Sequence, residues 1–374
     1  MSLFNVYPLF DITPVKAKDV YVYDKNNTKY LDLYGGHAVI SIGHSHPTYV
    51  KAISDQVEKL GFYSNAIQNP LQVQLADKLE ALSGCKDYQL FLCNSGAEAN
   101  ENALKLASFH TGKKKILAFE NSFHGRTSAA VAATDNPKIV SPLNAQQDVD
   151  FVALGDLKSV EGILKQDETC AVIIECIQGV GGLDESTTEF YQGLEKLCKK
   201  YNTLFVADEV QSGFGRTGDF FAFQEHNITP DIISLAKGMG NGFPIGGILI
   251  HPNIEASFGL LGTTFGGNHL ACVASLAVLK VLEEENLMQN AKDISAYFTE
   301  KAKTLPNLKA IKGRGLMLGL EFGFPVAELR KILIHEYKIF TGSAKNPNLI
   351  RILPPLTVQK KHIDTFFEAL EKAL

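Results

Sequence analysis

A repeated pattern of short apolar runs separated by helical segments constrains the fold of this chain more than any other feature. Leu71–Leu82 and Tyr191–Tyr201 have the residue spacing of helices. Strands that are apolar throughout and alternate with helices are typical of a mostly parallel sheet covered by helices on both faces. We therefore expect an α/β fold with a mostly parallel central sheet. The predicted strands are Tyr88–Cys93, Lys115–Phe119, Ala171–Glu175, Leu204–Ala207, Ile232–Ala236 and Ile245–Ile250.

The two ends of the chain have a different pattern. Val20–Tyr23 and Tyr30–Leu33 have the composition of strands, and the turn-forming residues between them predict a hairpin. After about Cys272 a long helix is predicted over Val273–Glu285, and the remaining tail alternates as in a smaller α+β unit. A chain of 374 residues exceeds the usual size of a single core, so we expect one large and one smaller domain.

The composition argues against several classes of protein. A formal net charge of -5 disfavours a nucleic-acid partner, because phosphate binding needs a basic excess. No apolar run is long enough to cross a membrane, and the N-terminus lacks the pattern of a signal peptide. The six cysteines lack the paired spacing of a disulfide framework or a zinc site. We expect a cytoplasmic protein without a bound metal, in which His44 and His46 are turn or structural residues.

Polar residues that follow an apolar run are the candidate site residues, because ligands of such sheets bind at the carboxyl ends of the strands. Lys237 follows the predicted strand Ile232–Ala236 and precedes a glycine-rich turn. A lysine at this position is partly removed from water, which lowers the pKa of its amine and favours the neutral, nucleophilic form. The alternative is an ordinary surface lysine in a strand-to-helix turn.

Two carboxylates, Asp208 and Glu209, end the predicted strand Leu204–Ala207. A buried carboxylate needs a partner, and a protonated pyridine nitrogen is one such partner. The alternative is an acid that pairs with a neighbouring arginine or caps a helix. The following Gly213–Gly218 matches the glycine pattern of dinucleotide sites. An aromatic cluster follows it where a helix is required, so we do not predict a nicotinamide or flavin site.

A third strand end carries Ser95, Gly96 and Ala97 at the point where a helix is predicted to begin. Free backbone N–H groups and the helix dipole favour a phosphate group there. The same residues also fit a serine N-cap with Glu98 three residues later, which is a capping box. The two interpretations are compatible.

Phe123 and Arg126 form the fourth group and follow the apolar run Lys115–Phe119. A phenylalanine there could stack on a planar ring, and an arginine could bind a carboxylate through two hydrogen bonds. The alternative is a core aromatic residue beside a surface arginine. Together the four groups supply the contacts that a phosphorylated pyridine aldehyde needs.

Seven stretches of the chain resemble, in order and spacing, the class III pyridoxal-phosphate-dependent aminotransferases, especially those of the acetylornithine or succinylornithine type. The resemblance implies fold type I, with a large cofactor-binding domain over residues 46–271 and a smaller α+β domain built from both chain ends, residues 1–45 and 272–374. It also implies pyridoxal 5′-phosphate as the cofactor and a homodimer with active sites at the interface. The stretches are LDLYGGHAVISIGHSHP, FLCNSGAEANENALKLA, FENSFHGRT, IIECIQGVGG, LFVADEVQSGFGRTG, DIISLAKGMGNGFPIGG and GTTFGGN.

The resemblance assigns a role to each matching residue. Lys237 carries the cofactor covalently and afterwards moves the proton, while Asp208 pairs with the pyridinium nitrogen. Arg126 and Thr263 hold the substrate, and Arg351 receives the α-carboxylate of 2-oxoglutarate or glutamate. The other cofactor contacts are Gln211 at the ring hydroxyl, Phe123 on the ring face, Ser95, Gly96 and Ala97 at the phosphate, and Thr264 from the second subunit.

The implied reaction moves the terminal amino group of N-acetylornithine or N-succinylornithine to 2-oxoglutarate, giving the semialdehyde and glutamate, as in arginine biosynthesis. One alternative is another class III ω-aminotransferase or aminomutase, of the ornithine, 4-aminobutyrate or glutamate-1-semialdehyde type. A non-catalytic metabolite-binding protein is a second alternative, against which the intact Lys237 and Asp208 argue.

Val180 departs from the family pattern, which commonly has a glutamate that pairs with the arginine matched here by Arg351. With valine at this position, we expect Arg351 to stay exposed and cationic throughout the cycle. The departure predicts a preference for an acyl group that bears its own carboxylate, such as succinyl, over neutral acetyl. Cys176 and His269 are smaller departures without a clear consequence.

Overall fold

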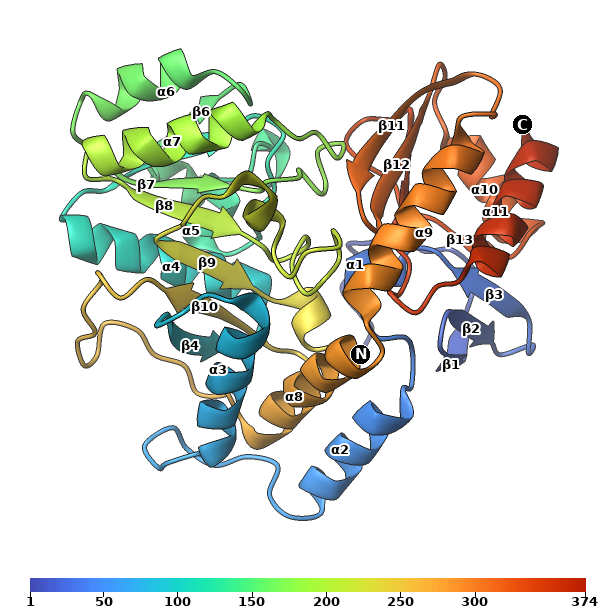
Figure 1. Ribbon diagram of the computed structural model, residues 1–374, viewed down its shortest axis with the longest axis horizontal. Coiled ribbons are helices and arrows are strands. Elements are labelled where there is room, and N and C mark those ends of the chain that lie inside the picture. Colours follow the sequence, from blue (N-terminus) through green and yellow to red (C-terminus); the bar gives the residue numbers. More distant parts are fainter.

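A seven-stranded sheet forms the centre of the structure, a computed structural model that describes residues 1–374 (Figure 1). The strand order is β4-β10-β9-β8-β7-β5-β6. Only β10 runs antiparallel to its neighbours, so the other six strands share one direction. The strands are β4 (Gln89–Cys93), β5 (Lys115–Phe119), β6 (Val149–Val152), β7 (Thr169–Ile174), β8 (Leu204–Asp208), β9 (Ile232–Leu235) and β10 (Gly246–Ile250).

The six strands predicted from apolar runs are confirmed, with ends that agree to within two residues. The seventh strand, β6, was missed. It lies at the edge of the sheet, where only Val152 of its four residues is buried, so its sequence carries little of the apolar signal. A mostly parallel sheet is therefore confirmed, with one antiparallel strand that the apolar pattern does not reveal.

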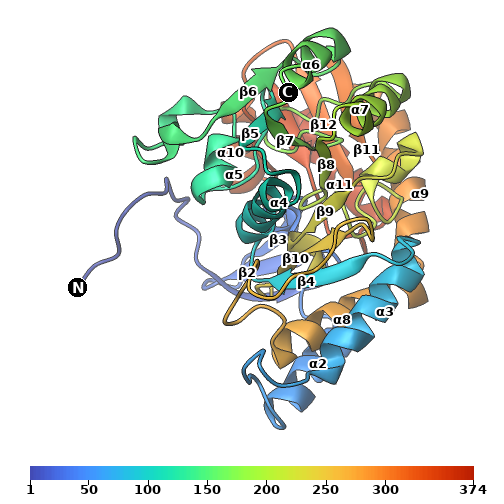
Figure 2. The ribbon, with the colours of Figure 1, turned by 90° about the vertical axis from the view of Figure 1, so that its left-hand side faces the viewer.

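Helices cover both faces of this sheet, with α4 (Gly96–Thr111) and α7 (Thr188–Lys200) on opposite sides (Figure 2). α7 buries Phe190, Tyr191, Leu194 and Cys198, which lie on one stripe of the helix. The other helices are α1 (Gly35–Ala38), α2 (Pro47–Val57), α3 (Pro70–Ser83), α5 (Ser128–Ala132), α6 (Leu157–Leu164), α8 (His269–Glu284), α9 (Leu287–Ala302), α10 (Ala327–His335) and α11 (Lys360–Ala373).

Two smaller sheets are built from the chain ends. The predicted hairpin is confirmed, because β2 and β3 pair antiparallel. β3 also pairs in parallel with β13, and Leu31 lies opposite Ile339. The division of the chain at residues 45 and 271 stays a prediction. The sheets are β1 (Pro14–Lys18), β2 (Tyr21–Asp24), β3 (Lys29–Asp32) and β13 (Ile339–Phe340), and β11 (Leu308–Arg314), β12 (Met317–Phe322) and β14 (Leu349–Ile352).

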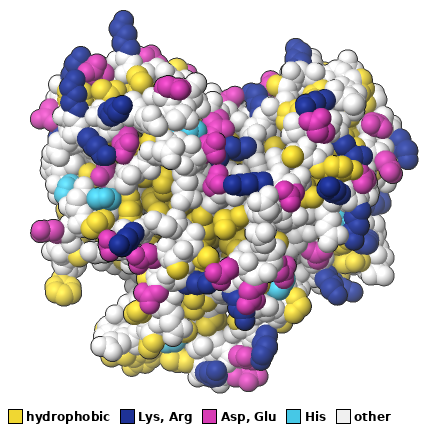
Figure 3. All heavy atoms as spheres, in the orientation of Figure 1, with side chains coloured by type: hydrophobic (Ala, Val, Ile, Leu, Met, Phe, Trp, Pro, Cys, Tyr) yellow, Lys and Arg dark blue, Asp and Glu magenta, His cyan; other side chains and the backbone are white.

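The surface shows mixed charge. Basic and acidic side chains are interspersed over the face in Figure 3, and neither type forms a continuous stripe there. No helix is both long enough and apolar enough to cross a membrane. All six cysteines are buried and unpaired with one another.

Candidate active site

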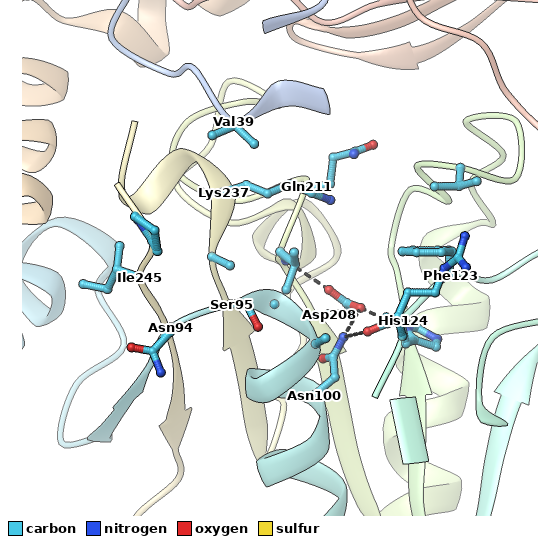
Figure 4. Close-up of a pocket in the computed structure, with 18 of the residues that line it drawn as sticks. Val39, Asn94, Ser95, Asn100, Phe123, His124, Asp208, Gln211, Lys237 and Ile245 are labelled. Atoms are coloured by element: carbon cyan, nitrogen blue, oxygen red, sulfur yellow. Dashed lines mark hydrogen bonds and ion pairs between the residues drawn. The ribbon is translucent and has the colours of Figure 1, made fainter. Parts of the chain in front are cut away.

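The carboxyl edge of the central sheet borders a cavity of about 360 Å³ that is lined by 21 residues. Its size lies within the usual range of small-molecule sites. The cavity brings together eight of the eleven predicted site residues, which come from the turns after β4, β5, β8 and β9 (Figure 4). These eight are Ser95, Gly96, Ala97, Phe123, Arg126, Asp208, Gln211 and Lys237.

Lys237 lies at the end of β9 with its backbone in the left-handed region, at φ +45°. Such a backbone conformation is rare for a side chain other than glycine, asparagine or aspartate, and it is often found at functional sites. Burial lowers the pKa of the Lys237 amine, although the nearby carboxylates of Asp208 and Glu175 oppose this shift. The residue therefore presents an amine that is more readily neutral and nucleophilic than an exposed lysine.

The carboxylate of Asp208 is held by three hydrogen bonds at the end of β8. Its Oδ2 accepts from Nδ2 of Asn100 at 2.8 Å and from Nδ1 of His124 at 2.7 Å, and its Oδ1 accepts from the N–H of Val210 at 3.0 Å (Figure 4). Asp208 is 5% exposed. Because every donor fixes the carboxylate in one orientation, its position in the cavity is set before any ligand binds.

Asn100 and His124 were missed by the sequence analysis. Asn100 lies on the buried face of α4 between Ala99 and Ala103, and a single polar residue on such a face was the available signal. His124 is adjacent to the predicted Phe123, and its side chain is fully buried against Asp208. Neither residue has a motif that distinguishes it from an ordinary core amide or histidine.

Glu175, at the end of β7, was also missed as a site residue. Its Oε1 accepts from the N–H of Phe123 at 2.9 Å and its Oε2 accepts from the N–H of Gly179 at 2.9 Å. Burial raises the pKa of this carboxyl group, with a further rise from Asp208 and an opposing effect from His124. Glu175 therefore ties the turn that carries Phe123 to the loop that precedes Val180.

The N-terminus of α4 forms the opposite wall of the cavity. Oγ of Ser95 accepts from the N–H of Glu98 at 3.2 Å, which confirms the N-cap. The return contact of the predicted capping box is shifted by one residue, because Oε2 of Glu98 accepts from the N–H of Asn94. The N–H groups of Gly96 and Ala97 lie in the first helical turn, where no intrahelical acceptor exists. A Cβ at Gly96 would lie 2.5 Å from Cγ1 of Val210, so this turn requires glycine.

Arg351 lies in β14 and its guanidinium group is held by carbonyl oxygens. Nε donates to the carbonyl of Ser343 at 2.5 Å, and Nη1 donates to the carbonyl of Gly179 at 2.6 Å and to Oε1 of Gln211 at 3.4 Å. Arg351 is 3% exposed, so the expectation that it stays exposed is wrong. It is buried because the loops of Gly179 and Ser343 close over the strand and satisfy its N–H groups.

No carboxylate is among the groups that hold Arg351. Val180 lines the cavity beside Gly179. Burial lowers the pKa of the guanidinium group, with the hydroxyl of Tyr34 and the carboxyl of Glu175 opposing the shift. Because a guanidinium group keeps its proton in proteins, the site retains a positive charge without an acidic partner.

Three predicted residues do not line the cavity of their own chain. Thr263 turns its hydroxyl to the N–H of Gly266 at 3.0 Å, and Thr264 is exposed. Arg351 lies behind the lining residues Gln211 and Val180. Arg126 does line the cavity and is exposed at its edge. The substrate roles of these residues stay predictions.

The two histidines of the Gly43–Pro47 turn have structural partners. His44 pairs with Asp32 at 2.8 Å, and His46 pairs with Glu285 at 2.9 Å and caps α2. No group of three or more histidine, cysteine or acidic side chains is arranged to hold a metal ion.

Comparison with known proteins agrees with the fold and with the cavity. The chain belongs to the class III aminotransferases, since residues 5–374 match the family model "Aminotransferase class-III". It is 40% identical to the acetylornithine aminotransferase of Bacillus subtilis, covering all of this chain and 97% of that protein. It is 41% identical to the acetylornithine aminotransferase of Aquifex aeolicus, covering all of this chain and 99% of that protein.

Solved structures show the same architecture. The ornithine aminotransferase of Toxoplasma gondii is 27% identical and has a TM-score of 0.91, covering 98% of this chain and 91% of that chain. A second structure of that enzyme, in which PLP partially occupies the active site, has a TM-score of 0.89 and covers 98% of this chain and 90% of that one. The predicted family, fold and class of enzyme, a PLP-dependent transaminase, are therefore confirmed.

Proposed function

We propose that this chain binds pyridoxal 5′-phosphate and transfers the terminal amino group of an N-acylated ornithine to 2-oxoglutarate, in a pathway of arginine biosynthesis. The observation that carries the proposal is the placement of Lys237 and Asp208 at the ends of the neighbouring strands β9 and β8, in one cavity with the free N–H groups of α4. The names of the relatives from Bacillus subtilis and Aquifex aeolicus support the substrate class.

The residues of the cavity fit this cofactor. Gly96 and Ala97 offer backbone N–H groups and the positive end of a helix dipole to the phosphate. Asp208 offers a carboxylate to the pyridine nitrogen. Phe123 and Gln211 line the same cavity. Lys237 offers the amine for covalent attachment. When bound, the cofactor supplies an electron sink for the carbon that loses its proton.

The chain's own residues then control the proton and the substrate. Lys237 would be the general base of the reaction, because burial lowers the pKa of its amine and makes the neutral form more accessible. Asp208 would hold the proton on the ring nitrogen, because its carboxylate is kept in place by hydrogen bonds from Asn100 and His124. Arg351 receives the α-carboxylate of 2-oxoglutarate or glutamate, and Arg126 holds the carboxylate of the amino donor at the edge of the cavity.

We propose further that the protein is a cytoplasmic homodimer in which Thr263 and Thr264 approach the cavity of the partner. Thr264 precedes Phe265, which is 60% exposed and lies 5.3 Å from the exposed ring of Phe62. Large exposed apolar side chains such as these favour a protein–protein interface. The N-terminal residues extend away from the body (Figure 2) and add to the exposed apolar surface. They include Leu3, Phe4, Tyr7 and Leu9.

Borohydride reduction of the purified, cofactor-saturated protein tests the cofactor assignment. We expect a pyridoxyl group on Lys237 by peptide mass analysis, and none in Lys237→Ala. Lys158→Ala, on the exposed surface of α6, is the matched control and should keep the label at Lys237. A label on another lysine, or no label at all, would rule the proposal out.

A panel of amino donors with 2-oxoglutarate tests the substrate class. We expect N-acylated ornithines to exceed ornithine and 4-aminobutyrate in kcat/KM, with Lys237→Ala as the blank. A preference for ornithine or 4-aminobutyrate would favour another ω-aminotransferase. Turnover of none of these donors by cofactor-loaded enzyme would contradict the proposal.

A further inference from the structure

The carboxylate of Glu101 links two helices that lie side by side, α4 and α5 (Figure 2). Glu101 lies in the second turn of α4, and its Oε2 accepts from the hydroxyl of Thr127 at 2.7 Å and from the N–H of Ala130 at 3.1 Å. Both of its oxygens also accept from the N–H of Ala129, at 3.0 and 2.9 Å. These N–H groups belong to the first turn of α5, where no intrahelical acceptor exists. Glu101 therefore caps α5 from a neighbouring helix.

Thr127 occupies the N-cap position of α5, but its side chain makes no capping hydrogen bond. A threonine at this position usually accepts from a backbone N–H of the first turn. Here Glu101 takes those N–H groups, and the hydroxyl of Thr127 donates to the carboxylate instead. Loss of the carboxylate would therefore leave both the helix end and Thr127 without their partner.

Arg126 lies between two residues that pack against the first turn of α4. On one side, a Cβ at Gly125 would lie 2.8 Å from Cβ of Ala97, so the backbone approaches α4 closely there. On the other side, Oγ1 of Thr127 lies 3.3 Å from the carbonyl oxygen of Ala97. The N–H of Ala97 is one of the two that we assign to the cofactor phosphate. The backbone of Arg126 is therefore held to the same helical turn as the proposed phosphate site.

The guanidinium group of Arg126, in contrast, has no partner within the chain. It makes no hydrogen bond or ion pair to another residue, and the side chain is exposed at the edge of the cavity. Arg351 differs, because carbonyl oxygens hold its guanidinium group. A free guanidinium group can bind a carboxylate through two hydrogen bonds if its backbone is correctly placed. The reach of Arg126 to a ligand therefore depends on the turn that Glu101 holds.

We infer that Glu101 is a positioning residue, which sets Arg126 at the place where it meets the carboxylate of the amino donor. Glu101 does not line the cavity, so it acts through Thr127 and the turn rather than on the donor. The inference rests on the proposed function, which assigns this carboxylate to Arg126, and it names the residue that holds the arginine in place. A carboxylate that only stabilised α5 would affect all donors equally.

Steady-state kinetics of the holoenzyme with 2-oxoglutarate test the inference, using two donors that differ only in a carboxylate. These donors are N-acetylornithine and N-acetylputrescine, and the corresponding succinyl pair is measured beside them. We expect the wild type to prefer the ornithine derivative of a pair in kcat/KM. In Glu101→Ala the ratio of the two kcat/KM values should fall by about 10–100-fold, since a displacement of about 1 Å can cost about 100-fold. Glu101→Gln, which retains one oxygen as an acceptor, should restore part of the ratio.

A double-mutant cycle with Arg126 distinguishes positioning from stability. If Glu101 acts through Arg126, Glu101→Ala should have little further effect on kcat/KM for the acylated ornithine once Arg126→Ala is present. Thr127→Val removes the hydroxyl but leaves the backbone contacts of Glu101, so it should lower the ratio less and serves as a second variant if Glu101→Ala does not fold. Glu189→Ala, at an exposed acid in the first turn of α7, is the control and should leave the ratio unchanged.

The outcomes separate the two levels of the proposal. The inference is overturned if Glu101→Ala lowers kcat/KM for both donors of a pair by the same factor, or if its effect multiplies with that of Arg126→Ala. It is also overturned if the wild type does not distinguish the two donors. In each case the enzyme still turns over an acylated ornithine, so the proposed function stands. If cofactor-loaded wild type turns over neither acylated ornithine, the proposed function fails and the inference fails with it.

Discussion

The inner end of the cavity and the region around Arg351 are built in different ways. At the inner end, Asp208 and Lys237 follow directly from parallel strands, and the carboxylate of Asp208 has three hydrogen-bond donors. Outside the cavity lining, Arg351 and His37 come from opposite ends of the chain. The guanidinium group is held by loop carbonyls and Gln211, and the Gly35–Ala38 turn has a left-handed backbone, with φ +68° at His37.

The two regions suit two kinds of ligand, one that stays bound in every cycle and one that changes during the cycle. A site that binds the same cofactor in every cycle gains from fixed, fully satisfied groups, because no reorganisation is needed when charge develops. A site that accepts two different substrates in turn cannot be satisfied by protein groups alone without losing affinity for both. In the proposed function, Asp208 and Lys237 belong to the first kind of site and Arg351 belongs to the second.

The largest expected effect is at the inner end, for Asp208→Asn. The amide keeps the shape of the side chain but not the charge that holds the ring nitrogen protonated. We expect kcat to fall by about 10³-fold, within the range of acid–base effects, while cofactor affinity changes much less. Steady-state kinetics and cofactor titration measure both quantities. Asp219→Asn, a surface acid paired with Lys292, is the control, and retention of activity to within tenfold in Asp208→Asn would contradict this role.

His124 is expected to have a smaller effect, because it acts through Asp208. Removing its Nδ1 donor with His124→Phe should lower kcat by about 10–100-fold, as for other buried hydrogen bonds to a charged group. The absorbance of the bound cofactor should also change its pH dependence, which a purely structural role would not cause. Asn100→Ala removes a neutral donor and should have a weaker effect on both measurements. An unchanged absorbance profile in His124→Phe would remove His124 from this network.

The strain of the Gly35–Ala38 turn predicts a change of sign between two matched substitutions. At position 37, glycine should give a more stable protein than alanine by about 1 kcal/mol, because only alanine retains the left-handed cost. At Lys105, an exposed position within α4, glycine should be less stable than alanine by about 1 kcal/mol. Chemical denaturation of the four variants measures both differences. The same sign at both positions would show that the turn is not strained.

The smallest effect concerns pH. The pKa of His37 lies below its ordinary value of 6.5 in the folded protein. As pH falls through 6.5, the unfolded chain takes up a proton that the folded protein resists, so His37 makes the folded state less stable in acid. His37→Gln should therefore lose less stability than the wild type between pH 7.5 and pH 5.5. Parallel unfolding curves at both pH values would contradict the shift.

The inner end of the cavity could be predicted from the sequence because its parts are local. An apolar strand predicts its own end, and the residue after that end lies at the carboxyl edge in any parallel sheet. This reasoning found Asp208, Lys237 and the turn at Gly96. It missed Asn100 and His124, because a buried polar residue can be recognised as functional only when its partner from another strand is known.

The region around Arg351 could not be predicted in the same way. The sequence identified Arg351 and the absence of an acid at Val180, but not the burial of the guanidinium group. That burial depends on Gly179 and Ser343, which lie in loops far from each other in the chain. The left-handed conformation of His37 is also invisible in the sequence, since the preceding glycines indicate a turn but not its hand.

The parallel pairing of β3 with β13 has a consequence for biosynthesis. Leu31 is synthesised early, but its pairing partner Ile339 leaves the ribosome about 300 residues later. All strands of the central sheet have been translated well before that point. A nascent chain can therefore complete the carboxyl edge of the central sheet before β13 and β14 exist. A product truncated before β13 would lack the neighbour that anchors the first hairpin.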